Sequence, residues 1–223
     1  MRMKTFSITL LLATGLLLLL PTAFGASITN GSFEAVQIAC CQSSNPADIP
    51  GWTHSGSPGD ALLWRVGYVD AGGSITTAGA GSQFITMGGG HDNFGTGSWS
   101  TVITGLLPGI IYNVSFMIAN ETINIPQSMT VQMLSGSSTG PATYNAGFSS
   151  AYYWRTWVPE VYTFQASGTD ATIQFSASVV ADLGLDNVSI APATTTVPEP
   201  SSLLLLSAGL LGIARAARRK LLR

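Results

Sequence analysis

A period-two alternation of apolar and polar residues runs through the middle of the chain and restricts it to β-structure. In residues 112–118 (YNVSFMI), Tyr112, Val114 and Phe116 fall on one face of an extended strand. The same alternation predicts further strands at 129–134, 161–166, 171–177 and 185–190. Turn-forming residues separate these segments, at 88–90, 107–109, 135–140 and 167–170. The pattern predicts an all-β fold, a single β-sandwich or jelly roll over residues 26–190.

An apolar run over residues 6–20 opens the chain. Arg2 and Lys4 precede it, and the small residues of 23–26 follow it. This order predicts a secretory signal peptide over residues 1–25, cleaved after Gly25 or Ala26, which the Sec machinery would recognise. An uncleaved anchor is the alternative, although the run is shorter than the ~20 apolar residues that a membrane span needs.

At the other end of the chain, three features follow a short Pro/Thr linker at 191–197. Residues 198–200 read Pro-Glu-Pro, residues 203–214 are mostly apolar, and basic residues cluster in 215–223. The positive-inside rule leaves that cluster in the cytoplasm, so residues 26–197 should lie outside the inner membrane. The apolar run predicts a short transmembrane helix of ~18 Å, which is a weak permanent anchor for a ~30 Å hydrocarbon core.

This tail resembles the PEP-CTERM sorting signal of Gram-negative bacteria. The residues that match its three parts are Pro198, Glu199 and Pro200, then 203–214, then Arg218, Arg219 and Lys220. The resemblance implies a precursor held transiently in the inner membrane until an integral-membrane exosortase removes the tail. The body would then reach the cell surface or an extracellular polysaccharide matrix. A plain C-terminal anchor is the alternative.

Charge is scarce and unevenly distributed. Only 9% of the residues are charged, against ~25% in an average soluble protein. Between residues 26 and 197 two basic residues, Arg65 and Arg155, face ten acidic ones, which gives a formal charge of −8. So few cations exclude nucleic-acid binding. An acidic body should also repel anionic polysaccharides unless divalent cations intervene.

A second resemblance, to galactose-binding-like jelly rolls, rests on short motifs. They stand at 30–34 (NGSFE), 49–52 (IPGW), 107–109 (LPG) and 185–189 (LDNVS). That group includes carbohydrate-binding modules, and in such domains acidic residues of the first and last motifs share a structural ion. The resemblance places it at Glu34 and Asp186, on first and last strands that lie side by side. Ca²⁺ takes the oxygen ligands they offer. Alternatively, Asp186 caps a turn and Glu34 is solvated.

The densest group of aromatic residues is 152–157 (YYWRTW). Sugar rings stack on exposed aromatic faces. If this segment is a strand with Trp157 turned inward, Tyr152 and Trp154 form an exposed pair, and Trp64 adds a second platform. These three residues are the candidate ligand-binding residues. The alternative is that their rings belong to the core.

The sequence offers little for catalysis. It has no nucleophile elbow and no zinc-ligand spacing. Asp92 could orient the imidazole of His91 for general-base work, and the alternative is that both lie in an exposed glycine-rich loop. Ten carboxylates leave a glycosidase open. The adjacent Cys40 and Cys41 could be free, bridge to another chain or form a strained ring.

These observations predict an exported, non-catalytic protein of the surface or the extracellular matrix, with extracellular polysaccharide as its candidate ligand. One alternative is a structural matrix protein without a discrete ligand. The other is a polysaccharide-active enzyme.

Overall fold

The computed structural model describes residues 25–39, 42–43, 45–56, 61–70, 73–87, 97–121, 126–147, 153–177, 183–193 and 209. The chain divides into two compact units, Met1–Pro192 and Ala193–Arg223. Within the described ranges, no helix is long and apolar enough to cross a membrane. The predictions outside the described residues concern the signal peptide up to residue 24, Cys40 and Cys41, His91 and Asp92, and Tyr152. They also concern the sorting motif, the short transmembrane helix at 203–214 apart from residue 209, and the basic cluster.

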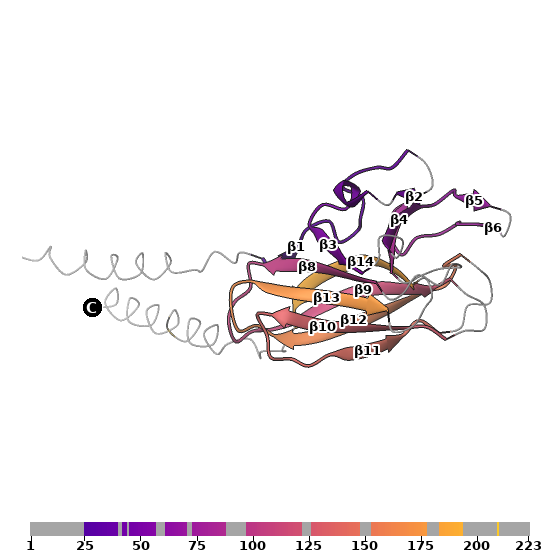
Figure 1. Cartoon of the computed structure of the whole chain (residues 1–223). Helices are drawn as coiled ribbons and strands as arrows, with labels where there is room; N and C mark the ends of the chain where they lie inside the picture. Colours follow the sequence, from indigo (N-terminus) through magenta and orange to yellow (C-terminus); the bar gives the residue numbers. More distant parts are fainter. Residues whose placement is uncertain are drawn as a thin grey trace, which may run out of the picture. The chain divides into compact units, whose positions relative to one another are not determined.

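Two antiparallel six-stranded sheets form the first unit (Figure 1). Sheet A has the order β1-β8-β13-β10-β11, and β3 also pairs with β8. Its strands are β1 (Ser27–Ile28), β3 (Trp52–Ser55), β8 (Ser98–Thr104), β10 (Ser128–Ser135), β11 (Ala142–Asn145) and β13 (Ala171–Ala177).

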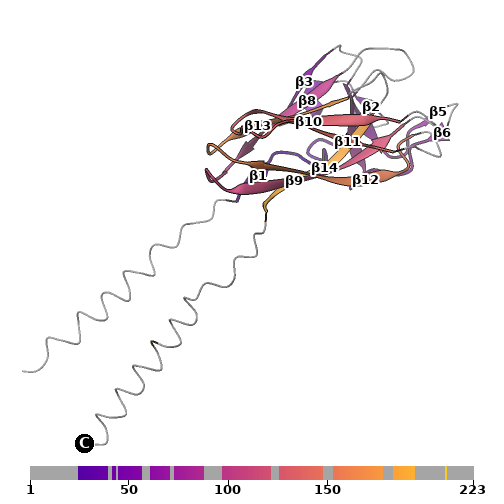
Figure 2. The ribbon, with the colours of Figure 1, turned by 90° about the horizontal axis from the view of Figure 1, so that it is seen from below.

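Sheet B has the order β12-β9-β14-β7-β4-β2. Its strands are β2 (Gln42–Ser43), β4 (Ala61–Arg65), β7 (Gln83–Met87), β9 (Ile111–Asn120), β12 (Trp157–Gln165) and β14 (Leu183–Pro192). A 3-10 turn, η2 (Pro46–Asp48), precedes β3, and β5 (Val69–Asp70) pairs only with β6 (Gly73–Ser74). Both views place this hairpin at the end of the sandwich away from β1 (Figures 1 and 2).

The five strands predicted from alternation are all present, and the prediction of an all-β sandwich is confirmed. Strand β13 covers the predicted 171–177 without a shift. Its odd-numbered residues are buried and its even-numbered residues are half-buried, so one face meets the core and the other meets solvent.

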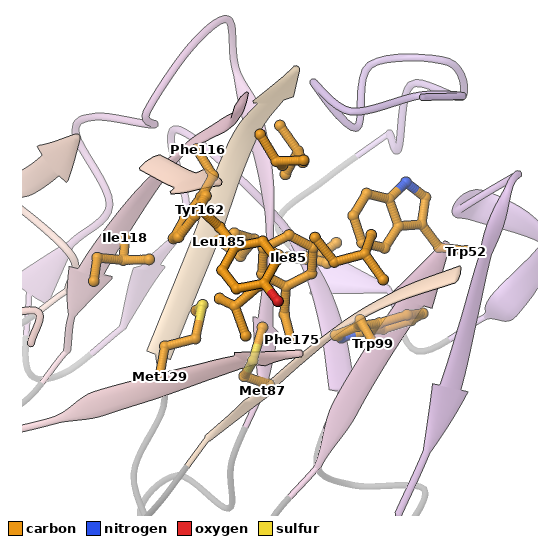
Figure 3. Close-up of a cluster of buried hydrophobic side chains, with 14 of the residues drawn as sticks. Trp52, Ile85, Met87, Trp99, Phe116, Ile118, Met129, Tyr162, Phe175 and Leu185 are labelled. Carbon is orange, nitrogen blue, oxygen red and sulfur yellow. The ribbon is translucent and has the colours of Figure 1, made fainter. Parts of the chain in front are cut away.

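The main core lies between the two sheets, where side chains from both meet (Figure 3). Phe175 on sheet A contacts Phe116 on sheet B, with ring centroids 5.3 Å apart. Trp99 is 2% exposed, and its indole Nε1 donates to the carbonyl oxygen of Thr86 across the sheets at 2.9 Å. That bond satisfies the one polar group that this large ring brings into the core.

The first and last strands meet in a different way from the one predicted. Strand β1 is hydrogen-bonded to β8 in sheet A, while β14 lies in sheet B. The contact comes from the turn after β1, where the amide of Val188 donates to the carbonyl oxygen of Gly31 at 2.8 Å. A side chain on Gly31 would overlap the carbonyl oxygen of Val188, so this close approach requires glycine.

Candidate functional site

The candidate sugar-stacking residues belong to a second apolar cluster on the outer face of sheet B. Its buried members come from β4, β7 and β9 and from two covering segments, and they are Trp64, Ile75, Phe84, Ala119, Tyr153 and Trp154. Trp154 is 1% exposed and lies 5.3 Å from Trp64 and 5.2 Å from Phe84 between ring centroids. We call this group the outer cluster.

The backbone before β12 turns Trp154 into the outer cluster. Tyr153 and Trp154 have φ angles of 73° and 50°, in the left-handed region that residues other than glycine rarely adopt. The strand begins only at Trp157. Gly184 on β14 lies two strands from Trp157, and a Cβ there would lie 2.9 Å from Trp157 and 3.0 Å from Trp154, so the indoles pack directly on the bare backbone of β14.

The prediction that Trp154 and Trp64 are exposed stacking platforms is therefore wrong. Trp64 is 8% exposed, and its indole Nε1 donates to Thr86 Oγ1 at 3.1 Å. The prediction assumed that residues 152–157 form one extended strand, whose alternation would place Trp154 outward. Two consecutive left-handed residues remove that alternation, and both Tyr153 and Trp154 turn inward.

Glu34 and Asp186, the candidate calcium ligands, hold one segment, residues 79–83. Glu34 Oε1 accepts hydrogen bonds from the backbone amides of Ser82 at 2.6 Å and Gln83 at 2.7 Å. Its Oε2 accepts from Ser82 Oγ at 3.1 Å and from Gln37 Nε2 at 2.5 Å. We call this arrangement, together with Asp186, the carboxylate clasp.

Asp186 completes the clasp from β14. Its Oδ2 accepts from the amide of Ala80 at 2.7 Å, and its Oδ1 accepts from the amide of Asn187 at 2.6 Å. The side chain is fully buried, at 0% exposed. The two carboxylates that the sequence paired thus approach one loop, Glu34 from the irregular segment after β1 and Asp186 from β14, which ties the segment before β7 to both ends of the domain.

The pKa values of the two carboxylates are shifted in opposite directions. Burial and, to a smaller extent, the charge of Glu34 raise the pKa of Asp186, backbone amide donors lower it, and the result is a pKa of about 7. Burial also favours a higher pKa for Glu34, but the combined hydrogen bonds from Ser82, Gln37 and Gln83 bring it below its ordinary value. Glu34 is therefore the charged member of the clasp, and Asp186 changes charge near neutral pH.

This difference predicts that the free energy of unfolding falls as pH rises from about 4 to about 7. Because the pKa of Asp186 is raised in the folded state, the folded state binds more protons than the unfolded chain between ~4 and ~7, so raising the pH through that window favours the unfolded chain. Urea unfolding in a chelator-containing buffer at both pH values measures it. The pH dependence should vanish in Asp186→Asn, and an equally steep dependence in that variant would contradict the assignment.

Calcium needs oxygen ligands with free lone pairs. Each oxygen of Glu34 already accepts two hydrogen bonds, which uses all four acceptor positions of a carboxylate. As the clasp is held here, Glu34 does not fit a shared ion. In the described part of the chain, no group of three or more His, Cys, Asp or Glu side chains could hold a metal. Calcium binding stays a prediction from the resemblance.

The partner segment of the clasp was missed in the sequence. Its signal is Gly79 and Gly81, which stand just before the buried strand β7. A Cβ on Gly81, whose φ is +63°, would lie 2.5 Å from Glu34 Oε1. A Cβ on Gly79 would lie 2.9 Å from the Cβ of Asp186. Glycine at both positions lets the loop backbone reach the two carboxylates.

The chain carries a PEP-CTERM protein-sorting motif at its C-terminus, which matches residues 196–220. This confirms the resemblance of the tail. No curated protein matches the sequence.

Solved structures give weaker likenesses to the body. The enzymatically active domain of tailspike protein 4 from bacteriophage CBA120 aligns with a TM-score of 0.47 and 16% identity over 74% of this chain. The chain spans only 21% of that phage protein. The CBM22-1 xylan-binding domain of Xyn10C from Paenibacillus barcinonensis aligns with a TM-score of 0.47 and 15% identity, over 77% of this chain and 97% of that one.

A third likeness is to TmCBM61, solved in complex with β-1,4-galactotriose. Its TM-score is 0.45 at 15% identity, over 74% of this chain and 96% of that one. All three scores lie below 0.5, so the ligands named for those proteins say nothing of this one.

Proposed function

We propose that this chain is an exported precursor from which an exosortase removes the C-terminal tail. The observation that carries the proposal is the sorting motif at 196–220, which begins only four residues after the last residue of β14, Pro192. The signal peptide brings the body across the inner membrane, and the tail holds it there until cleavage. The product is a β-sandwich at the cell surface or in the extracellular polysaccharide matrix of a Gram-negative bacterium.

The body works there as a non-catalytic module that contacts polysaccharide. Two observations support the non-catalytic part of this proposal, and the contact with polysaccharide follows from the proposed delivery to the extracellular matrix. The two carboxylates that sequence motifs single out are engaged in the clasp, where their oxygens accept backbone amides. The rings of the outer cluster fill the face of sheet B with the chain's own side chains.

Processing is tested by replacing Pro198, Glu199 and Pro200 together with alanine in a host that has an exosortase. The wild-type protein should accumulate without residues 218–223 in the surface or extracellular fraction. The variant should remain at precursor mass in the inner membrane, because the sorting enzyme no longer recognises its tail. Intact-mass spectrometry of each fraction measures both. A wild-type surface product that keeps Arg218, Arg219 and Lys220 would contradict the proposal.

A further inference from the structure

The outer face of sheet A carries two rows of hydroxyl and amide side chains without a charge, beside the exposed apolar side chain of Val102. The six strands of this sheet contain no Asp, Glu, Lys or Arg. All ten acidic residues of the body therefore lie elsewhere. Since surfaces of soluble domains are commonly ~25–35% charged, a sheet face without any charge on a body of formal charge −8 is a distinct surface. We call it the hydroxyl face.

Direct strand pairing aligns the side chains of the hydroxyl face into rows. One row crosses five strands and holds only hydroxyls, on Ser55, Ser98, Ser176, Thr130 and Thr143. The next row holds Thr53, Ser100, Gln174 and Gln132. All nine side chains are exposed or half-buried. With strands ~4.8 Å apart and outward positions ~6.8 Å apart along each strand, the rows form a lattice about 19 Å wide.

Cross-strand hydrogen bonds fix the groups in the middle of the hydroxyl face. Gln132 Nε2 donates to Gln174 Oε1 at 2.7 Å, and Gln174 Nε2 donates to Ser98 Oγ at 3.2 Å. Thr130 and Thr143 share a hydrogen bond between their hydroxyls at 3.5 Å. Each group keeps further donor or acceptor capacity toward solvent. A ligand that meets this face therefore orders few side chains on binding.

We propose that the hydroxyl face binds a neutral, hydroxyl-rich polysaccharide. Hydroxyl and amide groups exchange water for the hydroxyls of such a polymer without the desolvation cost that a buried charge imposes. A protein partner needs aromatic or arginine anchors, and the two rows provide none. A phospholipid surface or a nucleic acid needs basic or apolar groups. The proposal rests on the proposed delivery to the extracellular matrix and names the ligand class and the surface.

The test uses the mature exported protein and two Gln-to-Glu variants that change the net charge equally. Gln174→Glu places a carboxylate at the centre of the hydroxyl face. Gln42→Glu places one on β2, at the edge of sheet B, where its side chain is exposed. Co-sedimentation with microcrystalline cellulose and with curdlan, both neutral, measures binding, and alginate gel is the anionic comparison. Thermal unfolding checks that both variants are folded.

The parent and Gln42→Glu should bind a neutral polymer equally and should not bind alginate. Gln174→Glu should bind at least about tenfold more weakly, which corresponds to ~1.4 kcal/mol. Thr130→Val, which keeps the shape and removes one hydroxyl, should weaken binding severalfold.

Equal binding by the parent and Gln174→Glu would overturn the proposal, and so would a parent that binds neither neutral polymer. A parent dimer that Gln174→Glu dissociates in sedimentation velocity would assign the face to a second copy instead. Surface delivery is scored separately by intact mass. A protein that is delivered and processed but binds no polymer therefore removes this inference and leaves the proposed processing intact.

Discussion

Replacing Trp154 with alanine is expected to lower the free energy of unfolding by about 3–5 kcal/mol. The ring is 1% exposed, lies within 5.3 Å of Trp64 and 5.2 Å of Phe84, and packs on the bare backbone of Gly184. Alanine would leave a cavity between these partners, which fixed strands of sheet B cannot close. The backbone at position 154 would keep its unfavourable left-handed φ of 50° but lose the ring contacts that stabilise it. Urea unfolding followed by tryptophan fluorescence and circular dichroism measures the loss.

Tyr68→Ala is the matched control for this substitution. Tyr68 meets the same outer cluster edge-on, with its ring 4.9 Å from Trp64, but it is only half-buried. Its truncation should cost about 1 kcal/mol. A Trp154→Ala protein that unfolds at the wild-type urea concentration but loses binding to neutral glycans would contradict the structural role. It would restore Trp154 as a stacking platform.

The sequence predicted best those strands that have one buried face. In β9, Tyr112, Val114 and Phe116 alternate with outward residues because sheet B faces the core on one side there. Such a strand shows its period directly in the residue types. Strand β7 is buried on both faces, from Gln83 to Met87, and therefore shows no alternation. Its polar residues serve specific hydrogen bonds, as in Gln83 Nε2 donating to the carbonyl oxygen of Phe33 at 2.8 Å.

The outer cluster could not be predicted because periodicity does not reveal a second buried face. Trp64 and Leu63 are neighbours on β4 and point to opposite faces, and both are buried. The available signal is a run in which both the odd-numbered and the even-numbered residues have large apolar side chains. This pattern fits either a strand that is covered on both faces or a surface platform. The segment that covers Trp64 comes from residues 153–154, about 90 positions away, and its left-handed turn has no glycine to mark it.

The clasp was predicted in part. The motifs at both ends of the body correctly singled out Glu34 and Asp186, which the structure brings to one loop. What they bind there was not accessible from sequence. Backbone amides carry no residue-type signature, and only the glycines at 79 and 81 mark where a loop comes close. The jelly-roll resemblance suggested an ion between the carboxylates. In the structure, N–H and O–H donors instead occupy the acceptor positions of the Glu34 carboxylate.

Two substitutions at Glu34 separate these explanations. Glu34→Ala removes the acceptor of four hydrogen bonds and leaves the amides of Ser82 and Gln83 without it, so the free energy of unfolding should fall by about 2–4 kcal/mol. Glu34→Gln keeps a carbonyl oxygen for both backbone amides and turns its NH₂ toward Ser82 Oγ. The NH₂ cannot accept from Gln37 Nε2, so the charge and that one hydrogen bond are lost, and the substitution should cost about 1 kcal/mol.

Thermal unfolding of the mature protein with millimolar calcium and with excess EGTA completes the comparison. If hydrogen bonds alone hold the clasp, the melting temperature of the wild-type protein should be the same in both, and Glu34→Gln should remain close to it. If an ion is shared with Asp186, chelation should lower the wild-type melting temperature by several degrees, since a ligand that binds only the folded state stabilises it. Glu34→Gln should then melt at the EGTA value even with calcium present, because a neutral amide oxygen binds calcium less well than a carboxylate. The hydrogen-bonding geometry of Glu34 favours the first outcome, and a calcium-dependent melting temperature that Glu34→Gln abolishes would overturn it.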